Sequence, residues 1–284
     1  ATLSVWIHSY NASKVRADYD GFQIAELSDE EAAKMQDENT RKILSRGTVT
    51  YEDFGAVGDG VADDMESICK AHTFANLHRL PVQANAKGIY HLGMKALTAT
   101  VATNTDWGTA RFTVDDSGVA TKVESRRQTL FVVDSLLSAV KLELEPVKRD
   151  QMQVAARPEQ DCYVQVESDA RRVFIRRGSN QNKGSRLRDC FILRRDGAIE
   201  GPIDWDFDSY TRITARPIEQ DTLVVKGGVF TTLANRMLCD KGYSYWGRNI
   251  VVRRSNTVID GLTHYVVGET SVGAPYGGFL SASS

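Results

Sequence analysis

The sequence predicts an all-β repeat fold, a β-solenoid whose N-terminal end is covered by a helix. Three observations lead to this prediction. Residues 49–92 combine a strand, a glycine-rich turn, a helix start and a second strand within the length of a single repeat. From residue 48 onward the chain breaks into short β-rich runs separated by polar turns, and no second long amphipathic helix follows.

The turn and the helix of this opening segment are specified by glycine and aspartate. Gly55, Gly58 and Gly60 suit a chain that reverses through positive φ directly after an extended segment. Asp63 and Glu66 have the spacing of a capping box, so the sequence predicts a helix over residues 64–77. Because the end repeat of a solenoid leaves its hydrophobic core open, we expect this helix to cover that end.

The residues before this segment differ from those after it. Ser28 and Glu31 form a second capping box, and the helix that they begin ends near Arg46. Its few apolar side chains are typical of a linker or of an element that needs a partner. We therefore predict a mostly helical N-terminal neck or adaptor over residues 1–47, which could be multimeric, and a β domain over residues 48–284.

The rest of the chain supplies short strands rather than helices. Runs of apolar and β-branched residues lie at 99–102, 110–114, 129–133, 140–144, 163–166, 173–175, 191–193, 212–214, 222–225, 249–252 and 257–259. Such lengths fit a solenoid or a sandwich, and the opening helix favours the solenoid. In that fold we expect parallel strands stacked on one another, with alternate side chains inside and the function on the exposed faces and turns.

The opening segment also carries a family resemblance. The string DFGAVGDGVADD from Asp53 to Asp64, followed by a helix and by KGIY ending at Tyr90, resembles the start of the pectate-lyase-like right-handed parallel β-helix superfamily. That superfamily includes polysaccharide lyases, glycoside hydrolases and bacteriophage tailspike or appendage proteins. The resemblance implies a right-handed parallel β-helix with an N-terminal capping helix. Met65 stands where members usually carry Thr, and the motif specifies a fold better than a reaction.

The composition of the chain limits the classes of partner that we expect it to bind. With 42% hydrophobic and 25% charged residues the chain can bury a core, and its formal charge of -2 argues against a nucleic-acid partner. No apolar run has the length of a membrane span, and no intact signal peptide is present. The four cysteines are far apart and form no C-x-x-C pair, which argues against a zinc site.

The C-terminal end of the sequence lacks a closing element. After a glycine-rich stretch at residues 273–280 the chain stops at Ser284 without a helix or a polar cap. A solenoid needs its last repeat covered. We expect either that another chain covers it or, as we favour, that the β domain is truncated there.

The densest acidic run is a first candidate site. Asp204, Asp206 and Asp208 alternate with Trp205 and Phe207, so an extended segment would place the three carboxylates on one side. Such carboxylates could cleave a glycosidic bond, or hold Ca²⁺, which is the cofactor that the pattern allows. The structural interpretation is a solvated strand face whose aromatic side chains fill the interior.

A second candidate surrounds His264, with Arg253 and Arg254 upstream and Tyr265 and Tyr276 nearby. Lyases that cleave uronic-acid chains need a base for the C5 proton and a cation that stabilises the developing enolate, often with an acid for the leaving oxygen. His264 and Arg254 are therefore candidate catalytic residues, and both tyrosines are candidate substrate contacts. A single histidine on a strand can equally be structural.

Two further features suit carbohydrate binding. Tyr243, Tyr245 and Trp246 lie in a glycine-bounded loop and could stack on sugar rings, or cover the core. A basic region in the middle of the chain could bind an anionic polysaccharide if its arginines align, or form local ion pairs. Its members are Arg171, Arg172, Arg176, Arg177, Arg186, Arg188, Arg194 and Arg195.

Two hypotheses about function follow. In the first, the protein is an extracellular carbohydrate-active enzyme, a lyase or a glycoside hydrolase, that binds and cleaves an acidic polysaccharide. In the second, it is a non-catalytic structural or receptor-binding component of a phage tailspike or appendage, a homotrimer or a partner of other virion tail proteins. We favour polysaccharide binding with cleavage, and the sequence leaves enzyme status open.

Overall fold

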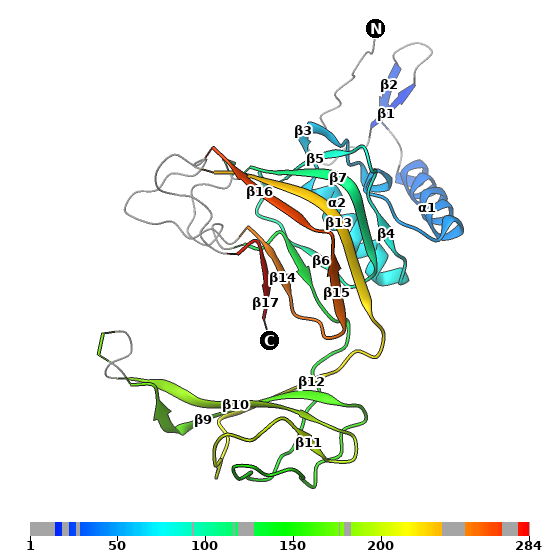
Figure 1. The fold of residues 1–284 in the computed structure, drawn as a ribbon. Helices are drawn as coiled ribbons and strands as arrows, with labels where there is room; N and C mark the ends of the chain where they lie inside the picture. The colour runs from blue at the N-terminus through cyan, green and yellow to red at the C-terminus, as the bar shows by residue number, and fades with distance from the viewer. Residues whose placement is uncertain are drawn as a thin grey trace.

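A computed structural model describes residues 15–18, 23–26, 29–92, 94–115, 117–118, 128–175, 177–178, 183–234, 248–268 and 278–283. Within them, two parallel sheets form the larger part of the molecule (Figure 1). The first contains β3 (Asp59–Asp63), β4 (Val82–Gln83), β5 (Ile89–Leu92), β7 (Thr105–Val114), β13 (Leu223–Leu233), β15 (Thr257–Asp260) and β16 (Thr263–Val267). The second contains β6 (Ala99–Val101), β8 (Phe131–Val133), β14 (Ile250–Val252) and β17 (Leu280–Ala282).

The two long strands of the first sheet bend at glycines. The register of β7 and β13 shifts beside Gly227, which pairs with Gly108, and both glycines have positive φ, +74° and +49°. A Cβ on Gly227 would lie 2.4 Å from the carbonyl oxygen of Gly108, so this close approach requires glycine. The bend divides each strand into two halves. β4 and β5 pair with the two halves of β7, and β15 and β16 pair with the two halves of β13.

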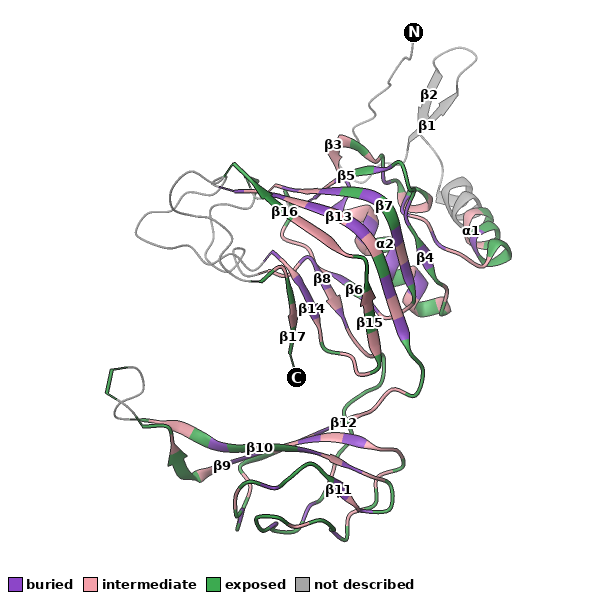
Figure 2. Cartoon of the chain, in the orientation of Figure 1, coloured by how far each residue is buried: buried purple, intermediate pink, exposed green. Residues whose placement is uncertain are grey.

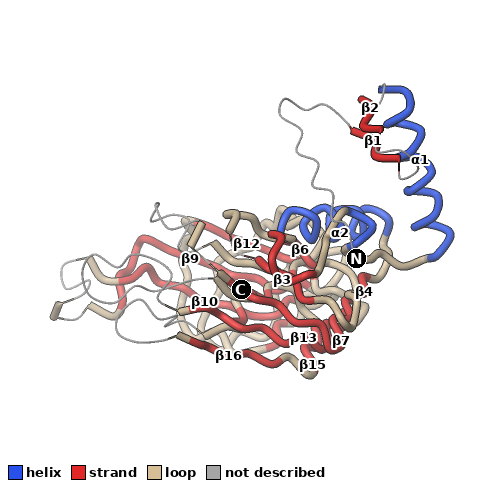
Figure 3. The backbone as a smooth tube through the Cα atoms, turned by 90° about the horizontal axis from the view of Figure 1, so that it is seen from above, coloured by secondary structure: helices blue, strands red, loops and turns tan. Residues whose placement is uncertain are grey.

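Both parallel sheets and the helix α2 (Met65–His78) share one hydrophobic core. The helix packs against β6 and the short 3-10 helix Glu52–Phe54, and it buries Met65, Ile68 and His72. Figure 2 shows stretches of buried residues on β7, β13 and α2, and Figure 3 shows α2 on one side of the parallel strands. The prediction of a helix at residues 64–77 is therefore confirmed within one residue at each end.

The expected capping box of α2 is not formed. The Asp63 carboxylate accepts a hydrogen bond from Met65 N at 2.9 Å, and Glu66 pairs instead with Lys70 and Lys95. These two ammonium groups lower the pKa of Glu66 to about 2. The buried Asp64 carboxylate accepts from Val57 N at 2.7 Å and from Gly58 N at 3.2 Å. Asp64 therefore fixes the glycine-rich turn to the start of the helix.

The N-terminal residues form a hairpin and a helix. β1 (Val15–Asp18) and β2 (Gln23–Glu26) pair antiparallel, and α1 (Asp29–Arg46) follows, in agreement with the helix predicted there. Ile43 is fully buried in the core of the parallel sheets, so the last turns of α1 are attached to that core. Whether residues 1–47 act as a neck, and whether that neck is multimeric, stays a prediction.

The middle of the chain forms a separate antiparallel unit. β9 (Cys162–Val173), β10 (Ser185–Leu193), β11 (Ile199–Glu200) and β12 (Arg212–Pro217) pair in the order β11-β10-β9-β12, all antiparallel. They have their own hydrophobic core, which includes Val164, Phe191 and Phe207. Figure 1 shows this unit joined to the parallel sheets by the chain before β9 and after β12.

The predicted fold class is therefore wrong. An all-β right-handed parallel β-helix requires every strand run to stack parallel on the next, but the runs at 163–166, 191–193 and 212–214 pair antiparallel with one another. The mixture of parallel and antiparallel sheets, with a helix packed on the parallel part, is closer to an α/β-type arrangement. Within the described residues, no helix is both long and apolar enough to cross a membrane.

Candidate ligand-binding cleft

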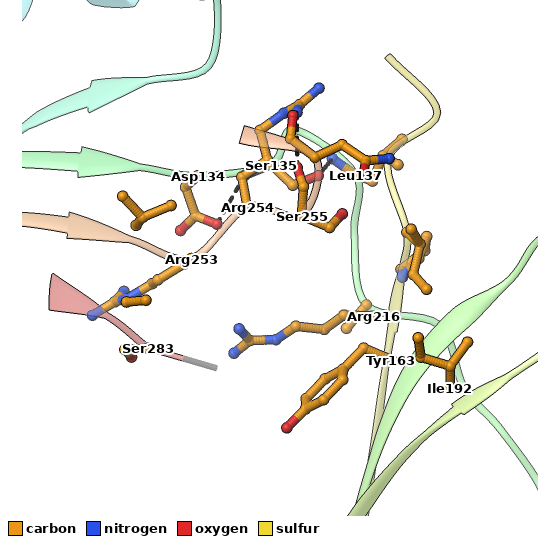
Figure 4. A pocket seen from close by; sticks show the side chains of 16 residues that line it. Asp134, Ser135, Leu137, Tyr163, Ile192, Arg216, Arg253, Arg254, Ser255 and Ser283 are labelled. Atoms are coloured by element: carbon orange, nitrogen blue, oxygen red, sulfur yellow. Dashed lines mark hydrogen bonds between the residues drawn. The ribbon is translucent and has the colours of Figure 1, made fainter. Parts of the chain in front are cut away.

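A cleft lies between the second parallel sheet and the antiparallel unit (Figure 4). Its volume is about 620 Å³. One wall comes from the ends of β8, β14 and β17, with Asp134, Arg253 and Ser283. The other comes from β9, β10 and β12, with Tyr163, Ile192 and Arg216. Volumes of this size are typical of pockets that hold a small molecule or a short segment of a polymer.

The cleft carries exposed positive charge. Arg216 and Arg253 are exposed, and neither side chain forms an ion pair or a hydrogen bond with any residue that the structure describes. Figure 4 shows Arg216 beside Tyr163 on one wall and Arg253 on the facing wall. A guanidinium presents a planar fork of donors that matches a carboxylate or a sulfate. Each of the two arginines can therefore bind an anion in the cleft.

Unlike Arg253, the neighbouring Arg254 is buried and bonded within the protein. Its side chain is only 7% exposed and donates to the carbonyl oxygens of Ser255, Asn256 and Asp221, each at 2.9 Å. It also lies 3.5 Å from the Glu219 carboxylate, whose other oxygen accepts from Ser135 Oγ at 2.6 Å. These contacts join the chain entering the antiparallel unit, the chain leaving it and the loop after β14. Arg254 holds the walls of the cleft in place.

The remaining polar groups of the cleft are few. Asp134 accepts from its neighbour Ser135 N at 2.9 Å and is the acidic side chain among the described lining residues. Tyr163 lines the opposite wall, where its ring offers an apolar face and its hydroxyl a donor and an acceptor. An aromatic ring beside the Arg216 guanidinium suits a ligand that has both an apolar face and an anionic group.

The acidic run at residues 204–208 belongs to the antiparallel unit and lies outside this cleft. The three aspartates are exposed and Phe207 is buried, as alternation predicts. The carboxylates have separate partners, because Asp208 pairs with Lys148 at 2.5 Å and Asp206 accepts from Arg149 N at 2.9 Å. The described residues contain no group of three acidic, histidine or cysteine side chains able to hold a metal ion.

His264 lies half-buried on β16 of the first parallel sheet. Its ring stacks on Phe279 with centroids 3.9 Å apart and 6° between the planes, and its Nε2 lies 2.9 Å from Thr232 Oγ1. Burial lowers the pKa of His264. Tyr265, the next residue on β16, points the other way and is 56% exposed. The structure does not bring His264 and Arg254 into a shared cavity among those found in the described residues.

Several predicted site residues cannot be placed. Tyr243, Tyr245, Trp246 and Tyr276 lie outside the described residues. Their expected contact with a substrate stays a prediction.

The basic region of the sequence is largely neutralised within the antiparallel unit. Arg188 pairs with the buried Glu167 at 2.9 Å, and Arg186 pairs with Asp169 at the same distance. Arg194 pairs with Asp161 at 2.6 Å. The Arg171 guanidinium lies 5.0 Å from the centroid of the Trp205 ring, a cation–π contact. Local ion pairs, the second interpretation of this region, therefore describe Arg186, Arg188 and Arg194. Arg177 and Arg195 form no ion pair with a described residue, and Arg176 lies outside the described residues.

Arg216, Tyr163 and Asp134 were not among the predicted site residues, and Arg253 was named only as a neighbour of Arg254. One sequence signal for these residues was their place after predicted strands: Asp134 directly follows one strand and Arg216 closely follows another. Which strand ends meet depends on tertiary pairing. No protein-family model and no curated protein matches this chain, so the proposals below rest on its own residues.

Proposed function

We propose that this protein binds an acidic polysaccharide in the cleft between the second parallel sheet and the antiparallel unit. The observation that carries the proposal is the pair of exposed arginines, Arg216 and Arg253, which face a cavity of about 620 Å³ without a carboxylate partner among the described residues. A charge-assisted, forked hydrogen bond from either guanidinium to a uronic-acid carboxylate contributes both affinity and orientation.

The chemistry of the cleft favours a sugar acid over other anions. The net charge of -2 provides no general attraction for polyanions such as nucleic acid, so binding depends on local contacts. Tyr163 and Ile192 supply apolar surface next to Arg216, which suits the C–H faces of a sugar ring. Because acidic polysaccharides are polymers of cell surfaces and matrices, we place the action of the protein outside the cell.

Cleavage is a separate question. Hydrolysis of a glycosidic bond generally uses two carboxyl groups, and Asp134 is the acidic side chain among the described residues of the cleft. Binding is therefore the function that the geometry supports best. The non-catalytic appendage hypothesis makes the same binding prediction, and it differs from the enzyme hypothesis in turnover and in oligomeric state.

The proposal is tested by isothermal titration of the full chain with polygalacturonate, alginate and hyaluronate. We expect binding to at least one polymer and about a tenfold weaker affinity after Arg216→Ala, since a charge-assisted hydrogen bond is lost. Arg111→Ala is the matched control, because Arg111 is an exposed arginine on β7 away from the cleft. Absence of binding to all three polymers, or equal losses in both variants, would overturn the proposal.

Two further readouts on the same samples address cleavage and assembly. Absorbance of unsaturated products and release of reducing ends separate lyase, hydrolase and non-catalytic binding. Mass by light scattering separates a monomer from a trimer. A trimer that binds without turnover favours the appendage hypothesis, and a monomer with turnover favours the enzyme.

A further inference from the structure

We infer that the tip of the β9–β10 hairpin docks on the surface of an anionic lipid bilayer. The hairpin tip comprises the described residues 172–175, 177–178 and 183–186, where β9 ends and β10 begins. The inference is independent of the polysaccharide cleft. It depends on two neighbouring exposed apolar side chains, on unpaired cations beside them, and on a backbone that fixes their surroundings.

The hairpin tip carries two consecutive exposed apolar side chains. Phe174 is 76% exposed and Ile175 is 59% exposed. In Figure 1 the β9–β10 hairpin reaches beyond the other strands of the antiparallel unit. Among the described residues, neither side chain belongs to either hydrophobic core. Exposed apolar surface of this kind is typical of a site that contacts a membrane or another protein.

The backbone of the hairpin tip is fixed by a glycine and by a bulge. Phe174 has a φ of +52°, which is rare for a bulky residue. A Cβ on Gly184 would lie 2.6 Å from Cγ1 of Ile175, so the close approach across the tip requires glycine. The pairing of the two strands shifts between Arg186 and Leu187, and such bulges are frequent beside functional sites. The exposure of Phe174 therefore belongs to a specified backbone conformation.

The hairpin tip is basic, although the whole chain is not. Residues 170–188 contain seven arginine and lysine residues and no acidic residue, whereas the net charge of the chain is -2. Arg177 and Lys183 are exposed, and neither forms an ion pair with a residue that the structure describes. Arg186 pairs with Asp169 at 2.9 Å at the base of the tip. The two unpaired cations are therefore free to contact an anionic surface.

These cations lie next to the apolar pair. Arg177 is two residues beyond Ile175 in the chain, and Lys183 is adjacent to Gly184, which Ile175 approaches. In the interface of an anionic bilayer, aromatic and aliphatic side chains enter the boundary of the acyl chains. Arginine and lysine beside them contact the lipid phosphates. Apolar insertion and charge together are the two signals that a peripheral protein needs for stable attachment.

Other classes of partner fit the hairpin tip less well. A stable protein interface buries about 800 Å² on each partner, which is more than two side chains supply. A nucleic acid would pair with the cations and could stack on Phe174, but it offers Ile175 no apolar partner. A bilayer meets all the exposed groups of the tip at once, so we expect a reversible contact with anionic lipid.

The test is flotation of the full chain with lipid vesicles. We expect binding to vesicles of phosphatidylglycerol and phosphatidylcholine in equal parts, and much weaker binding to phosphatidylcholine alone. Phe174→Ser should weaken binding about tenfold, because an apolar side chain no longer enters the interface. Leu77→Ser is the matched control, since Leu77 is 75% exposed and lies on α2, outside the hairpin tip.

Charge and insertion are measured on separate variants. Arg177→Ala/Lys183→Ala should weaken binding to the anionic vesicles about thirtyfold, and Arg111→Ala/Lys141→Ala, which removes the same charge outside the tip, should not. Phe174→Trp reports insertion. Brominated lipid should quench its fluorescence more than that of the unmodified chain, and Leu77→Trp should show no such increase.

The inference is overturned if the chain does not bind anionic vesicles, or if each tip variant behaves like its control. Polysaccharide affinity is measured on Phe174→Ser as well, and we expect it to be unchanged. Failure of vesicle binding while a polysaccharide still binds would leave the proposed function standing. If Phe174→Ser instead loses affinity for a polysaccharide or for a single-stranded oligonucleotide, the tip belongs to that ligand and the lipid inference fails.

Discussion

Phe112 and Phe230 occupy the same register position on the neighbouring parallel strands β7 and β13, and their rings stack with centroids 4.4 Å apart and 9° between the planes. The same position holds Tyr90 on β5 and His264 on β16. These four residues form an aromatic ladder through the first sheet. The half-buried His264 continues this row of rings, and its own ring stacks on Phe279, which also contacts Phe230.

Removing a ring from the aromatic ladder should be costly. Phe230 is fully buried and also contacts Trp107 and Phe131, so Phe230→Ala leaves a cavity at the centre of the core. We expect the free energy of unfolding to fall by about 3–5 kcal/mol. Phe174→Ala is the control, because Phe174 is 76% exposed and its loss should change stability by less than about 0.5 kcal/mol. Urea unfolding compares the two variants, and similar losses would contradict the packing described.

The bend of β13 gives a second prediction. In Gly227→Ala the alanine would have a positive φ, and its Cβ would lie 2.4 Å from the backbone oxygen of Gly108. Moving the backbone of Gly108 to relieve this clash costs free energy. Gly201→Ala has positive φ alone, with nothing within 4 Å of the new Cβ. We expect Gly201→Ala to cost about 1–2 kcal/mol and Gly227→Ala clearly more. Equal losses in thermal or urea unfolding would show that β7 and β13 do not approach closely at this point.

A buried polar chain links α2 to the first sheet. Trp107 Nε1 donates to the Tyr51 hydroxyl at 2.8 Å, and that hydroxyl lies 3.1 Å from His72 Nε2. Burial lowers the pKa of His72 to about 3. His72 therefore stays neutral in the folded protein while the unfolded chain titrates near the ordinary value of about 6.5.

The sign of the pH dependence follows from this difference. Below a pH of about 6.5 the unfolded chain binds a proton at His72, but the folded protein does not. The free energy of unfolding therefore decreases as pH falls toward 3, by up to about 1.4 kcal/mol per pH unit. His72→Phe cannot bind the proton and should show a shallower slope, with a constant offset because the Tyr51 hydroxyl loses its acceptor. Urea unfolding at pH 7, 6, 5 and 4 measures both slopes, and identical slopes would refute the assignment.

The adjacent residues Arg253 and Arg254 should separate binding from stability. Arg254→Ala removes the donor to three carbonyl oxygens and the partner of Glu219, so we expect a loss of about 2–3 kcal/mol of stability. Arg253→Ala should weaken polysaccharide binding and change stability by less than about 0.5 kcal/mol. Thermal unfolding and titration calorimetry on both variants test this division, which fails if Arg254→Ala unfolds like the unmodified chain.

Local sequence predicted the elements well. Glycine and aspartate at the turn before α2 gave the helix start within one residue, and most apolar runs from residue 99 onward became strands. These signals act between neighbouring residues: the Asp63 carboxylate accepts from Met65 N at the helix start, although the predicted capping box with Glu66 is not formed. The hydrogen bonds of the Asp64 carboxylate could not be predicted in this way, because Val57 N and Gly58 N come within reach of it only when the turn has folded.

Strand partners were not predictable in the same way. The alternation at Cys162–Val166 buries every second residue whether the neighbour runs parallel or antiparallel, so the pattern does not specify the pairing of β9. The error in fold class came from extending the signal of residues 49–92 to this region. The cleft was missed for the same reason, because Arg216 and Arg253 line one cavity only when the antiparallel unit is placed beside β14.

The most direct test of the proposed cleft is the affinity of the double variant Arg216→Ala/Arg253→Ala for polygalacturonate, alginate and hyaluronate. The matched control is Arg111→Ala/Lys141→Ala, which removes the same charge from exposed positions outside the cleft. We predict that affinity for the polymer that binds falls about a hundredfold in the first variant, as two charge-assisted contacts are lost, and less than about threefold in the control. Equal losses in the two double variants would contradict binding in the cleft.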